Sequence, residues 1–489
     1  MSASFARHTG LVAVGQASVK TTQLVLAVLL VRLLSPTDWN EAAFLLSIYL
    51  AGTTIGTLNV HHSIVFFLPR VTPGQHRALV HQNMRLLALI GACIVVVLTV
   101  AAPALSGGRL GDAERIPWLA VAIAFELPTA CVAMTMIATA RFVAAALWDV
   151  AGTAVVLGAT IVPVALGAGV SGLIGGLLVA AALRAAIGVV VVGRMLPART
   201  SGLPTGVLLD QLRYGLPLGL TVAVAMLNRL VDKWFIAAFH SGDFGVYAIA
   251  AQEIPLLAVL PYAGGAVLVT GLVEAFRTQD PGLAHRRWIE LTSSMSLVVV
   301  PIAMALVLVA PEVMVAVFTA EFAPGVVPFQ LFTLVTLHRV AEYGMMLRAA
   351  GRTRDLLVVA SSTLVANVVF AGVGAYAAGM TGASVGTVIA SGIGWWLALR
   401  RIADALGVPF GEAFAWRTWL SAVGLSATAA VAAAVIASAA TSPAARVTLK
   451  LAVFGAVVVP LLHLAGRADE PLGRRLGAPT PAVAVGADR

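Results

Sequence analysis

Long apolar segments separated by short polar ones run along almost the whole chain. Most are long enough to form a helix of about 20 residues, the length that crosses the hydrocarbon core of a bilayer. The pattern predicts fourteen transmembrane helices, with centres near residues 22, 54, 94, 128, 158, 183, 226, 258, 301, 338, 366, 390, 428 and 455. We therefore expect an all-α polytopic membrane protein.

The first six predicted helices recur in the next six at an offset of about 205–211 residues. The turn Ser35-Pro-Thr-Asp-Trp-Asn corresponds to Ser241-Gly-Asp-Phe-Gly, and Gly169-Val-Ser-Gly corresponds to Gly379-Met-Thr-Gly. Because each repeat holds an even number of helices, both insert with the same orientation. The repeat predicts two six-helix lobes of the MATE type, related by a pseudo-twofold axis along the membrane normal.

The repeat also sets the expected boundaries. Residues 1–200 would form the N-lobe and residues 201–405 the C-lobe, with two extra helices in 406–466. The segment 467–489 is rich in Pro, Ala and Arg, so we expect a disordered cytoplasmic tail.

The composition agrees with a membrane protein. Hydrophobic residues make up 60% of the chain and charged residues 11%, which is outside the range of soluble domains. The net charge of +9 does not indicate nucleic-acid binding, because the cations are dispersed between apolar segments and form no basic tail. Most arginines outside the predicted helices fall in even-numbered connections, so the positive-inside rule places both termini in the cytoplasm.

One apolar segment, 214–239, carries Asn228, Arg229, Asp232 and Lys233 where hydrocarbon is expected. A charge near the middle of a membrane helix costs roughly 2.5–3.5 kcal/mol on the translocon scale, so such residues usually face a bundle interior or a water-filled cavity. Helical spacing places these four side chains on one stripe. The segment is therefore predicted to line a cavity.

Other predicted helices contribute polar residues to the same interior, since two-lobe transporters bind substrate between the lobes near mid-membrane. Lys20 lies near the middle of the first helix with no acid one turn away. On the tenth predicted helix, His338, Arg339 and Glu342 are one turn apart. Further candidates are Glu126, Arg184 and Glu253.

Structural interpretations of these charges remain open. Arg229 with Asp232, and Arg339 with Glu342, could be ion pairs that hold helices together. Lys233 could snorkel to the interface. Similarly, Glu126 and Glu253 could be protonated core groups or proton-coupling groups.

Catalytic motifs are missing from the sequence. It has no Gly-rich nucleotide-binding loop, no cluster of metal ligands and no nucleophile elbow. The two cysteines, Cys93 and Cys131, lack metal-type spacing. We therefore expect a secondary transporter and not an enzyme, with no cofactor and no metal.

Several short patterns resemble those of the polysaccharide flippases, of the O-antigen and teichoic-acid type, in the multidrug/oligosaccharidyl-lipid/polysaccharide (MOP) exporter superfamily. They are Leu34-Ser-Pro-Thr-Asp-Trp, Asp232-Lys-Trp-Phe-Ile, Asp243-Phe-Gly-Val-Tyr-Ala, Glu321-Phe-Ala-Pro and Gly351-Arg. The resemblance spans nearly the whole chain. In the family pattern a glycine follows the Asp-aromatic pair, and the second repeat keeps it as Gly245 whereas the first has Asn40.

The resemblance implies alternating access that moves an undecaprenyl-diphosphate-linked oligosaccharide from the cytoplasmic to the outer leaflet of a bacterial plasma membrane, for export. A diphosphate needs cations in a low-dielectric cavity, and arginine can bind it through paired charge-assisted hydrogen bonds. The expected diphosphate ligands are Lys20, Arg229 and Arg339, followed by Arg184 and Lys233. The expected gating or coupling residues are Asp232, Glu253, Glu126 and Glu342. Membrane lipid, and a glycan polymerase or other export components, are the expected partners.

Three other functions remain open. A cation-coupled multidrug antiporter of the same superfamily would need carboxylates and aromatic walls for a cationic drug, whereas helices one and seven offer Lys20, Arg229 and Lys233 against Asp232. A membrane glycan polymerase or ligase would need a sizeable extracytoplasmic loop, and the odd-numbered connections are short. A flippase for a peptidoglycan precursor, lipid II, would use the same cationic site.

Overall fold

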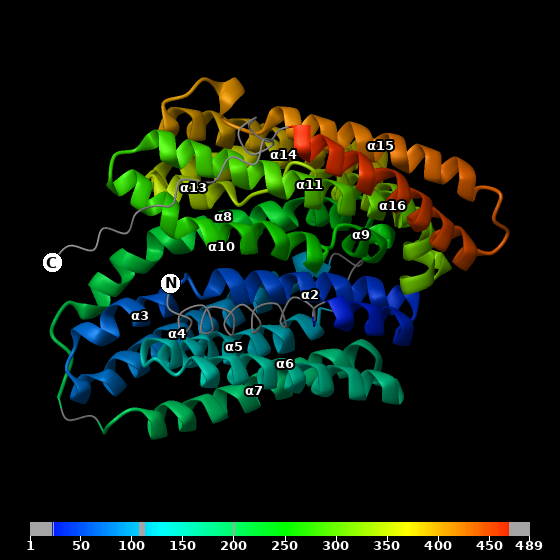
Figure 1. The fold of residues 1–489 in the computed structure, drawn as a ribbon. Helices are drawn as coiled ribbons and strands as arrows, with labels where there is room; N and C mark the ends of the chain where they lie inside the picture. The colour runs from blue at the N-terminus through cyan, green and yellow to red at the C-terminus, as the bar shows by residue number, and fades with distance from the viewer. Residues whose placement is uncertain (1–21, 23, 107–112, 199–200, 469–489) are drawn as a thin grey trace. The chain divides into compact units, whose positions relative to one another are not determined.

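The structure, a computed structural model, describes residues 22, 24–106, 113–198 and 201–468. Within these residues all regular secondary structure is helical, which confirms the predicted all-α class (Figure 1). Eight helices are long and apolar enough to cross a membrane, or nine if the bent pair Pro36–Gly56 and Val60–Arg70 forms one span. The predicted count of fourteen is therefore not confirmed within the described residues.

The first half of the chain is a series of antiparallel helices that lie side by side in Figure 1. After an apolar helix, Leu24–Leu33, the elements of this half are α2 (Pro36–Gly56), η1 (Val60–His62), α3 (Ser63–Phe67), η2 (Leu68–Arg70), α4 (Pro73–Ser106), α5 (Arg115–Ala138), α6 (Phe142–Pro163), η3 (Val164–Ala168) and α7 (Gly169–Met195). Small residues allow close packing between them: a Cβ atom on Gly91 of α4 would lie 2.7 Å from the Ala124 Cα of α5.

The second half contains more interruptions. Its helices are α8 (Val207–Phe239), η4 (Ser241–Asp243), α9 (Phe244–Ala250), α10 (Pro255–Arg277), α11 (Pro281–Val313), η5 (Met314–Phe318), η6 (Ala320–Gly325), α12 (Val326–Val335), α13 (Tyr343–Ala349), α14 (Thr353–Leu406), η7 (Phe410–Glu412), α15 (Trp416–Ala437) and α16 (Pro443–Ala468). The helices predicted near residues 258 and 338 are both broken, at 251–254 and at 336–342. The first break precedes Pro255, which disfavours helical backbone at Ile254 and has no N–H to donate.

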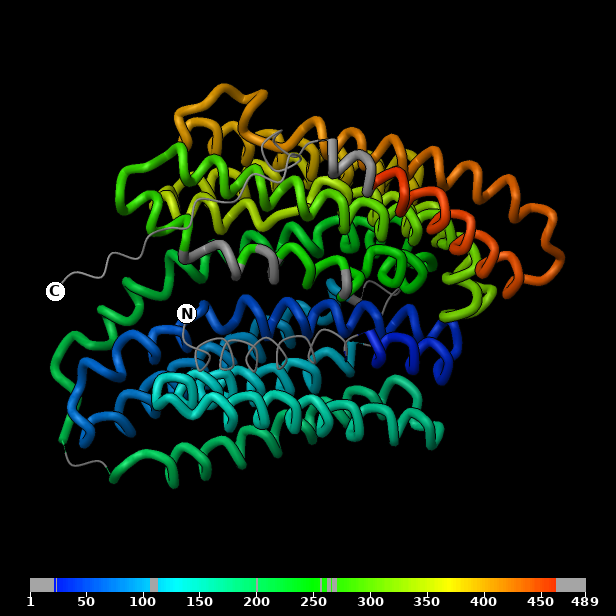
Figure 2. Tube along the Cα trace, in the orientation of Figure 1, coloured from blue at the N-terminus to red at the C-terminus, as the bar shows by residue number. Residues whose placement is uncertain are grey.

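Two sharp turns support the internal repeat. Gly169 has φ/ψ of 56°/−145° and Gly379 has 56°/−139°, a left-handed region that favours glycine. Figure 2 shows the trace reversing between α6 and α7 at the first of these turns. At the second, the arms of α14 are in close contact, since a Cβ on Gly386 would lie 2.3 Å from the Phe370 carbonyl oxygen. The two corresponding sequence segments thus adopt the same backbone conformation.

The chain forms two compact units. Among the described residues, unit 1 comprises those up to 259 together with 313–335 and 351–398, and unit 2 comprises 260–312, 336–350 and those from 399 to 468. The boundaries predicted from the repeat, at residues 200 and 405, stay a prediction.

Unit 2 has its own core and a buried ion pair. Trp288 is fully buried, and its indole N–H donates to the Ala413 carbonyl at 2.9 Å. The Lys450 ammonium on α16 lies 2.8 and 2.9 Å from the two carboxylate oxygens of Glu312 on α11. Lys450 lies within α16 and is buried.

Candidate functional site

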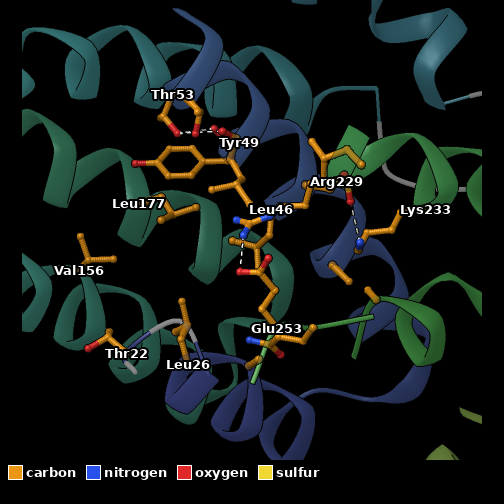
Figure 3. A pocket seen from close by; sticks show the side chains of 18 of the residues that line it. Thr22, Leu26, Leu46, Tyr49, Thr53, Val156, Leu177, Arg229, Lys233 and Glu253 are labelled. Carbon is orange, nitrogen blue, oxygen red and sulfur yellow. Dashed lines mark hydrogen bonds and ion pairs between the residues drawn. The ribbon is translucent and has the colours of Figure 1, made fainter. Parts of the chain in front are cut away.

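Unit 1 contains a cavity of about 570 Å³ (Figure 3). Its walls come from the helix Leu24–Leu33, from α2 and α5 to α9, from the broken segment that follows α9, and from the start of α10. The α2 wall carries Trp39, Tyr49 and Thr53. All of the described lining residues belong to unit 1.

The predicted polar stripe of α8 lines this cavity with two of its four members, Arg229 and Lys233. The Arg229 guanidinium forms an ion pair with the Glu253 carboxylate, which comes from the break after α9. The Lys233 ammonium donates to the Arg229 carbonyl at 2.8 Å. Figure 3 shows both interactions, with the Arg229 side chain extended toward Glu253. The cavity thus receives two cations from one face of α8.

The other two stripe residues are held by neighbouring helices. Asp232 is 1% exposed and accepts a hydrogen bond from the Tyr247 hydroxyl at 2.9 Å. The Asn367 amide of α14 donates to the Asn228 carbonyl at 2.9 Å. The proposed structural pair between Arg229 and Asp232 is therefore wrong, because Arg229 pairs with Glu253 and Asp232 is hydrogen-bonded within the helix packing.

A second ion pair lies on the wall made by α5, α6 and α7. The Arg184 guanidinium pairs with the Glu126 carboxylate, and each side chain is 17% exposed. The Arg184 guanidinium carbon lies 5.9 Å from the Trp148 ring centroid. Room for the guanidinium comes from Gly152, where a Cβ would lie 2.8 Å from the Arg184 Nε. Three elements therefore fix this pair in place.

The described wall is electrically balanced. Its cations are Arg184, Arg229 and Lys233, and its acids are Glu126, Asp149 and Glu253. The described lining therefore holds as many acids as cations, and the predicted contribution of Lys20 lies outside the described residues. Paired charges are what a low-dielectric interior requires, because an isolated charge there is costly.

A comparison of the sequence with known protein families identifies the family of this chain. A family model described as "Polysaccharide biosynthesis protein" matches residues 29–327, which is more than half of the chain. The chain belongs to this family. A search of curated proteins finds no match.

Solved structures place this polysaccharide biosynthesis protein in the MOP fold. It is similar to the lipid II flippase MurJ in an inward closed conformation, with a TM-score of 0.70 and 12% identity over 92% of this chain and 99% of that one. It is also similar to an inward-facing multidrug resistance MATE family transporter of the MOP superfamily, with a TM-score of 0.59 and 16% identity over 79% of this chain and 95% of that one. A third similar structure is a MOP superfamily transporter from Pyrococcus furiosus described by the reverse polarity of its binding pocket, with a TM-score of 0.55 and 16% identity over 82% of this chain and 97% of that one.

These comparisons show that the chain belongs to a polysaccharide biosynthesis family and that its fold is similar to that of a lipid II flippase and of MATE transporters.

Three predicted site residues are not found among the described residues that line the cavity. Lys20 lies outside the described residues. Arg339 and Glu342 belong to unit 2 and lie in the non-helical segment 336–342, so their predicted helical stripe with His338 is wrong. Glu342 accepts two hydrogen bonds from Arg348, at 2.9 and 2.7 Å. The proposed roles of Lys20, Arg339 and Glu342 stay predictions.

The structure adds residues that sequence reasoning missed. Asp149 on α6 lines the cavity, as does the aromatic ring of Tyr49 on α2. Asp149 is an isolated charge in an apolar segment, the same signal that singled out Glu126. Its place on the cavity wall could not be seen, because helical periodicity does not say which neighbour a face meets.

In this polysaccharide biosynthesis protein, two repeat-equivalent turns are joined beside the cavity. The indole N–H of Trp39, a lining residue, donates to the Gly245 carbonyl at 3.0 Å. Asn40 accepts from the Gly245 N–H at 2.5 Å and donates to the Gly242 carbonyl at 2.5 Å. Asn40, which departs from the family's glycine, thus joins the turn of the first repeat to that of the second.

Replacing Gly152 with valine should separate Arg184 from Glu126 and destabilise unit 1 by about 1–3 kcal/mol, the usual cost of forcing extra atoms into a packed site. Gly158→Val is the matched control on the same helix, because a Cβ there would have no neighbour within 4 Å. Thermal unfolding of both variants in detergent measures the difference. Equal melting temperatures for the two would contradict the role assigned to Gly152.

Proposed function

We propose that this protein moves an undecaprenyl-diphosphate-linked oligosaccharide from the cytoplasmic to the outer leaflet of a bacterial plasma membrane, by alternating access of two lobes. The observation that carries the proposal is the cavity face formed by Arg229 and Lys233 in a polysaccharide biosynthesis protein. The fold similarity to a lipid II flippase adds support. In the proposed topology, both termini lie in the cytoplasm.

The physical basis is the chemistry of the diphosphate headgroup. Arg229 can donate two parallel hydrogen bonds to one phosphate, and Lys233 on the next turn adds a compact positive charge. The Arg229 side chain is 42% exposed, so a headgroup in the cavity can reach it. The lipid tail can stay in the bilayer, so only the polar headgroup has to be enclosed.

The test is the distribution of lipid-linked glycan between leaflets after depletion of the protein in its own host. Depletion should cause lipid-linked glycan to accumulate in the inner leaflet, and returning the wild-type protein to the depleted cells should relieve this accumulation. Arg229→Ala should reduce flipping about 10-fold to 100-fold at matched membrane abundance, because a charge-assisted hydrogen bond contributes about 1.5–3 kcal/mol. Lys20→Ala tests the predicted contribution of the first helix in the same assay.

Two other cargoes give distinct outcomes. Multidrug export is the second candidate, because the fold is similar to MATE transporters and three acids line the cavity. Normal lipid-linked glycan together with reduced efflux of cationic dyes would replace the flippase proposal by an antiporter. Accumulation of lipid II alone would identify a peptidoglycan precursor as the cargo.

A further inference from the structure

The ion pair between Arg229 and Glu253 differs from the other described charge contacts at the cavity in its exposure. Its two side chains are 42% and 40% exposed. Those of Arg184 and Glu126 are 17% exposed, and those of Lys233 and Asp232, whose charged atoms lie 3.8 Å apart, are 12% and 2% exposed. The Arg229 pair is therefore the one that an incoming anion can contact from the cavity.

The two residues of this pair differ in backbone conformation: one lies in a helix and the other in a non-helical segment. Arg229 lies well inside α8, which runs without interruption from Val207 to Phe239. Glu253 lies in the non-helical segment between α9 and α10. A residue outside the helical hydrogen-bond ladder can change its backbone angles at lower cost, and broken helices are where transporters place moving binding groups. The backbone that carries the carboxylate can thus move at lower cost than the backbone that carries the guanidinium, which is held within a helix.

The local charges also balance while the pair is closed. Arg229 and Lys233 are offset by Glu253 and by the buried Asp232. An anionic headgroup can take the place of the Glu253 carboxylate, so that Arg229 has an anionic partner both before and after the exchange.

We propose that Glu253 is a stand-in anion that occupies the Arg229 site in the absence of cargo, so that the cargo phosphate binds by exchange with the Glu253 carboxylate and leaves when the carboxylate returns. This inference rests on the proposed function. It makes Glu253 a competitor of the cargo and not a ligand. Removing its charge therefore strengthens cargo binding and slows cargo release.

The experiment measures binding to the full-length protein in phosphatidylcholine nanodiscs by calorimetry. The probe is farnesyl diphosphate, a short polyprenyl diphosphate, and farnesol is the control without an anion. Glu253→Gln should lower the Kd for farnesyl diphosphate about threefold to fivefold, as expected for removing a partly exposed competing ion pair. Arg229→Gln should raise the Kd, and Glu253→Gln should have no further effect in the Arg229→Gln background.

Asp149→Asn is the matched control for charge alone. It removes one acid from the same cavity, on the wall that carries Arg184, so it reports the general electrostatic effect. In proteoliposomes, Glu253→Gln should lower both the KM and the kcat for lipid-linked cargo, because tighter binding is accompanied by slower release.

The outcomes separate this inference from the proposed function. If Arg229→Gln weakens binding but Glu253→Gln leaves it unchanged or weakens it, the exchange is wrong and the diphosphate site stands. If Asp149→Asn tightens binding as much as Glu253→Gln does, general charge explains the result and the exchange is again wrong. If wild type binds farnesyl diphosphate no better than farnesol, the proposed function fails, and the inference fails with it.

Discussion

Replacing Lys450 with alanine should destabilise unit 2 by about 3–5 kcal/mol, the cost of breaking a buried ion pair by removing one partner. The Lys450 and Glu312 side chains are only 10% and 9% exposed, so water cannot replace the lost ammonium. The ammonium also donates to the Leu308 carbonyl at 3.0 Å, and that bond is lost too. The variant should therefore unfold at a lower temperature in detergent, as followed by tryptophan fluorescence.

Two further variants show whether the cause is the unpaired carboxylate. Lys450→Leu combined with Glu312→Leu removes both charges and should restore most of the stability, because replacing a whole buried pair by apolar residues is often neutral. Arg277→Ala breaks the pair with Glu274, whose side chains are 72% and 54% exposed, and should leave the melting temperature unchanged. If the double variant were as unstable as Lys450→Ala, lost packing and not the buried charge would explain the effect.

Replacing Gly245 with valine should open the cavity beside Trp39. Any Cβ at this position would lie 2.6 Å from both the Asn40 Oδ1 and the Trp39 Cδ1. The three hydrogen bonds that join the equivalent turns would then be lost, each contributing about 0.5–1.5 kcal/mol. Losing the stabilising free energy of these three hydrogen bonds raises the ratio of open to closed protein about tenfold or more, since each 1.4 kcal/mol is a factor of ten.

Leu46 lies on α2 and lines the cavity. The measurement is the rate at which a membrane-impermeant thiol reagent labels Leu46→Cys from the outside of intact cells. In the proposed topology, the turn that precedes α2 lies on the outer side. Cys93 and Cys131 are both free thiols, so both are first replaced by serine. Gly242→Val is the matched control, because a Cβ there has no neighbour within 4 Å. Equal labelling rates for the Gly245 and Gly242 variants would show that this contact does not close the cavity.

The internal repeat was the strongest sequence result, and the structure supports it at defined residues. Gly169 and Gly379 were aligned by sequence alone, and both adopt the same left-handed conformation. Such turns can be predicted because the requirement for glycine is local. Charged residues in apolar segments were also informative, since Arg229, Lys233, Arg184, Glu126 and Glu253 all line one cavity.

The pairing of those charges could not be predicted. The sequence suggested Arg229 with Asp232, three residues apart, whereas Arg229 pairs with Glu253, 24 residues away across a break. Arg184 and Glu126, 58 residues apart, form the second pair. Lys450 pairs with Glu312, 138 residues away. A charge pairs with whichever partner the packing of helices brings to it, and spacing along one helix reports only the local candidates.

By itself, the sequence determined the helical membrane class, the family and the set of charges that membrane burial makes expensive, because these depend on composition and local periodicity. The tertiary structure decided which two members of the α8 stripe line the cavity, which carboxylate neutralises Arg229, and where the helices predicted near residues 258 and 338 break. These features depend on which residues far apart in the chain are brought into contact. That choice is made by side-chain packing between helices, and no single segment encodes it.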